Sequence, residues 1–340
     1  MAEEKEKLDK QPVKPSVDDK YGKIDEETKD LLKRYELEYF REDKPIPFCG
    51  LLIYPVQVRH YEEFASCCTC LTLNKNEDPM GIRFSHLDYL INKMNIKEND
   101  EGKIWTYKLQ RLFEIIFRLS NGIKCKNEKC NHIIKYSDDV LRNYFKEVTQ
   151  KLEEAKSKNT EFEAPKLHCP ECGGTDFSEM IGIIQDPQTK KNAFTVNGHI
   201  INRDDWAKLR QIVLFQNYPD YVDDSWVDPE IKKDHEEKIR LQQQKNDLHA
   251  SIEKKVVCLS IATHYNCEEI YDMSIRRFTM TLTATEDLIN YKIMKQAVMS
   301  GFVSLPKGQS IEHWMWKPVK DIYGDSYKDA DSVQQSVSNL

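Results

Sequence analysis

The sequence predicts a mainly α-helical protein with a small β-containing zinc ribbon inserted near its middle, so the fold class is α+β overall. Apolar residues recur at three- and four-residue steps in most of the long segments, which indicates helices. Short β-branched runs and two pairs of cysteines gather in the middle of the chain. We therefore expect a disordered tail at 1–20, a helical domain with a short strand at 21–121, the zinc-ribbon insertion at 122–200, a helical domain at 201–323 and a disordered tail at 324–340.

The composition is that of a polar globular protein. Of the 340 residues, 39% are hydrophobic and 31% are charged, and Lys+Arg 50 against Asp+Glu 57 gives a net charge of -7. That balance provides no overall field for a polyanion, because duplex binding requires the neutralisation of many phosphates. No stretch approaches the ~20 apolar residues of a membrane span, and the N-terminus lacks the apolar core of a signal peptide. We expect synthesis in the cytosol, no membrane contact, and reduced cysteines that bind metal or lie buried.

The first block is predicted to hold several helices and one strand. EETKDLLKRYELEYF, HYEEFASCCTCLTL and FSHLDYLINKM have helical spacing. The stretch FCGLLIYPVQV has the β-branched and aromatic content of a strand, which Pro55 ends or places at a sheet edge. The strongest helical pattern is WTYKLQRLFEIIFRLSNG, a core helix that Asn121 and Gly122 should end.

The rest of the chain alternates strand and helix signals. In the insertion, MIGIIQ predicts a strand, the Asn-Gly pair at 197–198 a hairpin turn, and SDDVLRNYFKEVTQKLEEAKSK an amphipathic helix. In the third block, Asn202 should cap DDWAKLRQIVLFQ, and Pro229 should open one long, mostly polar helix that continues through ASIEKKVVCLSIATHY. Asn266 and Glu269 form a capping-box pattern before EEIYDMSIRRFTMTLTATEDLINYKIMKQAVMSG, and IEHWMWKPV is expected to dock onto the helices.

Two cysteine pairs supply the clearest chemical pattern. KCKNEKCNH places Cys125 and Cys130 in one loop, and HCPECGG places Cys169 and Cys172 in a typical knuckle, whose glycines permit the turn. Zinc prefers tetrahedral sulfur and nitrogen ligands, and two knuckles satisfy that geometry without much backbone strain. We predict that all four sulfurs coordinate one Zn2+ ion. Such a closed site leaves no position for substrate or water, so its predicted role is structural.

Three alternatives to this site stay open. His132 or His168 could replace one sulfur, or the two pairs could be unrelated reduced thiols. The ribbon could instead bind nucleic acid, because four lysines surround the first knuckle and ribbons often serve in transcription or replication. Glu128 and Glu171 lie in the same loops, and the aromatic residues that stack on bases are missing, so we do not expect that binding.

The remaining motifs do not indicate an enzyme. The histidines form no HExxH pattern, and neither a Gly-x-Ser-x-Gly elbow nor a phosphate-cradling glycine loop occurs. A second metal site joining FASCCTC to Cys49 or His60 is disfavoured, because adjacent cysteines on a helix point in different directions. Core packing is the preferred interpretation of five cysteines, namely Cys67, Cys68, Cys70, Cys258 and Cys267.

Segments at both ends of the chain, together about half of it, share a pattern with one family. IPFCGLLIYPVQVRHYEEF combines a short strand, the letters YPV and a helix start, and LQRLFEIIFRLSNGI is a helix that follows. Towards the C-terminus, HYNCEEIYDMSIRRFTMTL is followed by SGFVSLPKGQSIEHWMWK, which contains Ile311, His313 and Trp314. These segments resemble the tail assembly chaperones and related tail-module proteins of long-tailed bacteriophages.

The resemblance implies a non-enzymatic helical protein that binds the aggregation-prone tape-measure protein while the tail tube polymerises around it, in the cytoplasm of the infected bacterial host. A long amphipathic client exposes apolar stripes before assembly, and a helical groove with aromatic and Met side chains could cover them. Ordinary core packing competes with that role for each candidate groove residue: Phe113, Phe117, Trp206, Phe215, Met294, Met299, Trp314 and Trp316. Two other functions compete with it, a structural virion protein of the tail or baseplate and a zinc-ribbon regulator of transcription.

Overall fold

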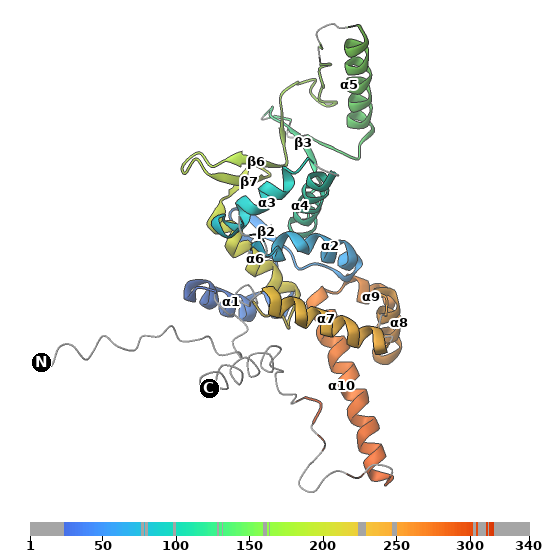
Figure 1. Cartoon of the computed structure of the whole chain (residues 1–340). Helices are drawn as coiled ribbons and strands as arrows, with labels where there is room; N and C mark the ends of the chain where they lie inside the picture. Colours follow the sequence, from blue (N-terminus) through green and yellow to red (C-terminus); the bar gives the residue numbers. More distant parts are fainter. Residues whose placement is uncertain are drawn as a thin grey trace, which may run out of the picture. The chain divides into compact units, whose positions relative to one another are not determined.

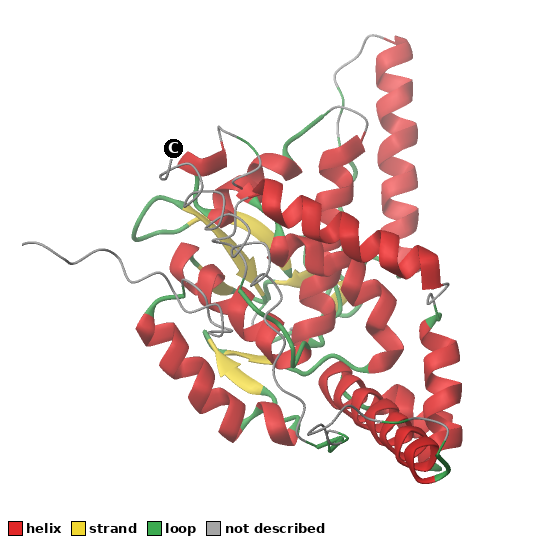
Figure 2. Cartoon of the chain, turned by 60° about the horizontal axis from the view of Figure 1, so that its bottom comes forward, coloured by secondary structure: helices red, strands yellow, loops and turns green. Residues whose placement is uncertain are grey.

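The structure is a computed structural model, and it describes residues 24–75, 78, 81–97, 100–127, 129–130, 132–158, 162, 164–223, 229–246, 250–301, 304, 311 and 313–315. These residues form a mainly helical chain with small antiparallel sheets, which confirms the predicted fold class (Figure 1, Figure 2). No helix among them is long and apolar enough to cross a membrane.

The chain divides into two compact units. Unit 1 comprises Met1–Glu38, Gln57–Arg59 and Leu214–Leu340, and unit 2 comprises Tyr39–Val56 and His60–Val213. The domain boundaries predicted from the sequence, after residues 121 and 200, stay predictions.

Unit 2 begins with a β-hairpin where one strand was expected. Strands β1 (Ile46–Phe48) and β2 (Leu51–Ile53) pair antiparallel within FCGLLIYPVQV. The single-strand prediction is wrong because Cys49 and Gly50 have φ angles of 47° and 79°, which turn the chain back on itself. Positive φ is uncommon outside glycine, so a cysteine at position 49 does not predict the turn.

Three helices follow the hairpin and build a core. They are α2 (Tyr61–Thr72), α3 (His86–Met94) and α4 (Glu101–Phe117), and both α2 and α3 pack against α4. Helix α4 ends at Phe117, earlier than predicted. Arg118 caps it in the left-handed conformation with φ 51°, and Gly122 instead opens the first strand of the ribbon.

A second sheet of unit 2 follows the ribbon. Strands β6 (Ile181–Gln185), β7 (Asn192–Val196) and β8 (His199–Ile201) pair antiparallel in that order. The predicted turn between β7 and β8 is confirmed, with φ 49° and 83° at residues 197 and 198. Helix α6 (Arg203–Asn217) then starts at the predicted cap, where the Asn202 side-chain oxygen accepts hydrogen bonds from two backbone amides at 2.9 and 3.0 Å.

Aromatic side chains join the segments on either side of the ribbon into one core. Phe113 of α4, Phe194 of β7 and Trp206 of α6 are fully buried. Their rings meet edge to face, with centroid distances of 5.2 to 6.0 Å. Trp206 Nε1 also donates a hydrogen bond to Nδ1 of His86 at 3.0 Å. The ribbon is thus inserted between sequence segments that share a hydrophobic core.

Unit 1 is helical. Its elements include α1 (Glu26–Glu38), α7 (Pro229–Asn246), α8 (Ile252–Thr263), α9 (Cys267–Asp272) and α10 (Ile275–Met299). Pro229 opens α7 as predicted, but the single long helix expected from it is wrong. A new helix, α8, starts after Ser251, whose side chain accepts a hydrogen bond from the Lys254 amide.

The predicted capping box of Asn266 and Glu269 is confirmed at the start of α9. The helix that it opens is shorter than expected, because Met273 and Ser274 are extended and the Ser274 side chain caps α10 instead. Of the predicted docking segment IEHWMWKPV, only residues 311 and 313–315 are described, and the His313 ring lies 5.2 Å from that of Tyr291 in α10.

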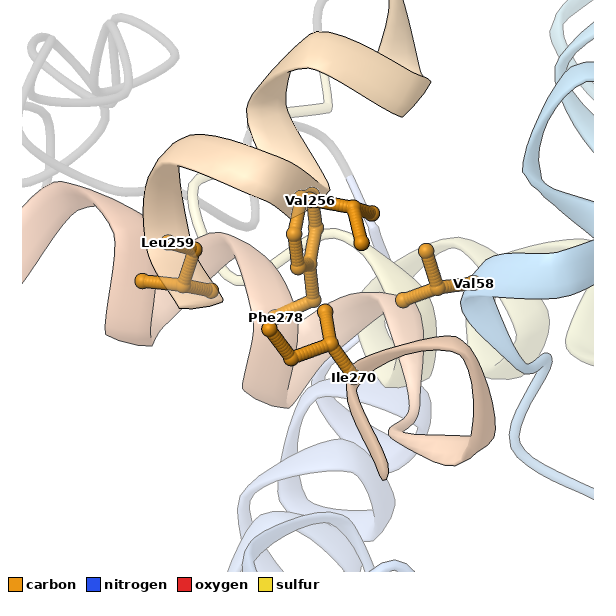
Figure 3. Close-up of a cluster of buried hydrophobic side chains, with 5 residues drawn as sticks. All are labelled: Val58, Val256, Leu259, Ile270 and Phe278. Carbon is orange, nitrogen blue, oxygen red and sulfur yellow. The ribbon is translucent and has the colours of Figure 1, made fainter. Parts of the chain in front are cut away.

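The core of unit 1 lies where α8, α9 and α10 meet. Figure 3 shows the side chains of Val58, Val256, Leu259, Ile270 and Phe278 converging on one point. Each of them is at most 2% exposed. Val58 belongs to the short segment Gln57–Arg59, and its amide donates a hydrogen bond to the Met273 carbonyl at 2.9 Å, which ties that segment to the helices.

Replacing Phe278 by Ala is expected to lower the free energy of unfolding of unit 1 by about 3–5 kcal/mol, since it removes a buried aromatic side chain and leaves a cavity. The matched control is Met280→Ala on the same helix, where the side chain is 53% exposed. Urea unfolding of both variants measures the difference. Equal effects of the two substitutions would contradict the assigned core.

A second prediction concerns how the free energy of unfolding depends on pH, and it rests on His86, a buried histidine of unit 2. Burial, followed by the charge of Arg210, lowers the pKa of His86 well below its ordinary value of 6.5. Below pH 6.5 the unfolded chain therefore binds a proton that the folded chain does not, and the free energy of unfolding falls as the pH decreases. His86→Gln keeps an acceptor for Trp206 but does not titrate. Its unfolding free energy should depend less steeply on pH below 6.5, by up to about 1.4 kcal/mol per pH unit. An unchanged slope in urea titrations would disprove the assignment.

Candidate metal centre

The ribbon is a sheet of three short strands that ends in cysteines. Strand β3 (Gly122–Cys125) lies between β4 (Ile133–Lys135) and β5 (Phe177–Glu179), and both neighbours are antiparallel to it. Cys125 is the last residue of the central strand and pairs with Phe177. Cys130 lies in the loop between β3 and β4, and the knuckle with Cys169 and Cys172 leads into β5.

The four cysteines of the two pairs meet at one point. Their Sγ atoms all lie within 4.8 Å of one another, and Cys125–Cys172 and Cys130–Cys169 are each 3.6 Å apart. In a tetrahedral site with a Zn–S distance of about 2.3 Å, neighbouring sulfurs are about 3.8 Å apart. The four sulfurs therefore fit one tetrahedral metal ion, and the predicted set of four cysteines is the set that the fold brings together.

Backbone groups shape the second knuckle around its sulfurs. The amide of Cys169 donates to the Gly174 carbonyl at 2.8 Å, and the Gly173 amide donates to the Cys169 carbonyl at 2.8 Å. A hydrogen bond from the Gly174 backbone is the largest influence on Cys172 and lowers the pKa of its thiol to about 7. A Cβ atom at Gly174 would lie 3.3 Å from Cys172 Sγ, so glycine lets the backbone approach the sulfur closely.

The two histidines beside the knuckles do not join this group. His132 Nδ1 lies 3.0 Å from a carboxylate oxygen of Glu171, and His168 Nδ1 lies 3.2 Å from the Gly173 carbonyl. Among the described residues, the cluster with metal-ligand geometry consists of four cysteines alone. The alternatives with a histidine ligand are therefore not supported by this geometry.

The other cysteines differ in their surroundings. Cys67, Cys68 and Cys70 are buried in α2, and burial raises the pKa of the Cys67 thiol to about 11 and that of Cys70 to about 12. Such thiols stay protonated near neutral pH, so they pack as small apolar side chains. The core prediction is wrong for Cys258, which is exposed on α8.

Half of the predicted partner-binding residues are core residues. Phe113, Phe117, Trp206 and Phe215 are 0 to 4% exposed, because the apolar faces of their helices pack inside the fold. They offer no surface to a partner, and that part of the prediction is corrected. Met294 and Met299 are 42% and 80% exposed on α10. The described part of the chain also contains Trp314, which is partly buried, while Trp316 lies outside it.

A family model described as the YomV second domain matches residues 242–317. It is a phage-type domain family, and the match includes α8, α9 and α10. The metal centre and the rest of unit 2 lie outside the match. No curated protein and no solved structure matches the chain.

Changing Cys169 and Cys172 together to Ser is expected to abolish metal binding and to unfold the ribbon, since two of the four ligands are lost. Helices α8 to α10 should keep their structure, because they belong to the other unit. Metal analysis by mass spectrometry and hydrogen exchange measure the two effects. The control is Cys258→Ser, which removes an exposed thiol from α8. A double variant that retained one equivalent of metal would disprove the assignment.

Proposed function

We propose that this protein is a non-enzymatic phage tail assembly factor, which binds the tape-measure protein or another tail protein during tail morphogenesis. One observation carries the proposal: in the segment similar to a phage-type domain, helices α8 and α10 expose large apolar side chains. The resemblance of both chain ends to tail assembly chaperones indicates that the client is a phage tail protein. Action in the cytoplasm of the infected host follows from that role.

Helix α10 exposes several large apolar side chains in the matched segment. Its buried residues are Ile275, Arg276 and Phe278, all within its first turns. Further along, apolar side chains are open to solvent, with Ile293 57% and Met299 80% exposed. Contiguous exposed apolar surface marks interaction sites, and flexible Met side chains adapt to apolar partners of varied shape.

Helix α8 adds a second exposed strip in the same segment. Val257 and Ile261 are 45% and 73% exposed, and Tyr265, which follows the helix, is 46% exposed. The neighbouring positions Val256 and Leu259 point into the core. A helix that is apolar on both its inner and its outer face is suited to pack between its own domain and a partner.

The metal centre supports a role in folding and not in chemistry. We propose that the ion is zinc, since four cysteine ligands with tetrahedral spacing are typical of structural zinc sites. Such a site has no open coordination position at which a substrate could be activated. The buried, protonated thiols of α2 are likewise poor nucleophiles.

The proposal is tested by purifying the tagged protein from infected cells and identifying co-purifying proteins by mass spectrometry. The wild type should recover a tape-measure or other tail protein, and Ile289→Glu with Ile293→Glu should lose it, because two charges then interrupt the apolar surface of α10. Lys292→Glu, which adds negative charge to the same helix without removing an apolar group, is the control and should retain the client.

Mature particles from the same lysate separate the two tail functions. An assembly factor should be absent from the particles. Its presence at a fixed stoichiometry would instead identify a structural tail or baseplate protein. If no tail protein co-purifies with the wild type and the chain is absent from particles, the proposal is wrong.

A further inference from the structure

The helix inside the metal ribbon has a coiled-coil pattern that its own fold covers only in part. Helix α5 (Asp139–Lys158) lies in the chain between Cys130 and Cys169. Apolar side chains recur along it in steps of four, three, four and three residues, which is the spacing of the a and d positions of a heptad repeat. They are Leu141, Phe145, Val148, Leu152 and Ala155. We call this row the α5 seam.

The α5 seam is only partly covered, because Val148, Leu152 and Ala155 are half-buried. Leu141 is the one buried residue among the described positions of the helix, and Phe145 is 49% exposed. At its base α5 packs against β4, and the Phe145 ring stacks on Tyr136 with a centroid distance of 6.5 Å. Among the described helices of unit 2, none runs alongside α5 (Figure 1). An amphipathic helix gains most of its stability from packing its apolar face, so this seam is suited to a partner helix.

The charges beside the seam are of one sign. The e and g positions, which flank a and d, carry four basic side chains and no acidic one: Arg142, Lys151, Lys156 and Lys158, with Tyr144 and Thr149 at the other two positions. The acidic side chains of the helix all fall at b and c, on the opposite face: Asp139, Glu147, Glu153 and Glu154. Charges at e and g set partner choice in coiled coils.

The ion pairs within α5 do not remove this asymmetry. Arg142 pairs with Asp139 at 2.9 Å, Lys151 with Glu147 at 2.9 Å and Lys158 with Glu154 at 3.7 Å, each about one helical turn away. All six side chains are between 48% and 83% exposed. Such exposed pairs are weak and screened by solvent, so an acidic group on a docked partner can compete for the same lysines.

We infer that the α5 seam binds an amphipathic helix whose apolar stripe is flanked by acidic side chains. A second copy of α5 does not fit, because either orientation of two such helices sets basic e and g residues against basic ones. The metal centre brings together the two ends of the segment that carries α5, since the Sγ atoms of Cys130 and Cys169 are 3.6 Å apart. It thereby fixes the base from which α5 extends. This inference concerns unit 2 and does not depend on the proposed role in tail assembly.

Two synthetic peptides of about three heptads test the inference on the full chain. Both carry Leu at a and d, and one has Glu and the other Lys at every e and g position. Fluorescence anisotropy should show that the Glu peptide binds roughly tenfold or more tightly than the Lys peptide. Phe145→Glu should abolish binding of both, and Lys151→Glu with Lys156→Glu should reverse the preference.

Lys146→Glu is the matched control, since it makes the same charge change at a b position and should leave both affinities unchanged. Bound metal, measured for every variant, shows that the ribbon is intact. Equal binding of the two peptides, binding of neither, or a wild-type dimer in sedimentation that Phe145→Glu converts to monomer would overturn the inference. A failed purification of tail proteins would overturn the proposed function and leave these peptide affinities unaffected.

Discussion

The closure of four cysteines around one point is the constraint on which the middle of this protein depends. Cys130 and Cys169 are 39 positions apart in the chain, yet their sulfurs lie 3.6 Å from each other. The strands of the ribbon have only three or four residues, and such a small sheet cannot bury enough apolar surface to fold alone. A metal ion bound by these four sulfurs would supply the missing stability, because its binding free energy becomes folding free energy.

That closure has a consequence for the rest of unit 2. The chain leaves the aromatic core at the end of α4 and returns to it at β7 and α6, where Phe194 and Trp206 pack on Phe113. Between these points lie the ribbon and α5. With the knuckles closed, the long insertion leaves and rejoins the core at a fixed place and α5 has a defined base. Without them, residues 118–180, which separate α4 from β6, would form a long loop whose closure costs conformational entropy.

Local patterns predicted the four cysteines and the helix caps Asn202 and Asn266, but they missed the caps at Arg118, Ser251 and Ser274. Each of the successful signals is a short-range pattern: two or four residues between cysteines, or a side chain that reaches an amide two or three positions on. The errors in the predicted partner surface arose because non-local packing decides which apolar helix faces are covered. Phe113 and Phe145 both lie on apolar faces of amphipathic helices, but one is fully buried and the other 49% exposed. Periodicity identifies an apolar face and does not say what covers it. The turn at Cys49 was missed because its residue type seldom takes positive φ.

We propose that one metal ion is held by sulfur alone in the middle of the chain. X-ray absorption at the zinc edge, on the purified full-length protein with its metal content measured in parallel, tests this claim most directly. We expect one ion per chain and a first shell of four sulfurs at about 2.3 Å. A first shell that contains nitrogen or oxygen, or a protein that binds no metal under reducing conditions, would contradict it.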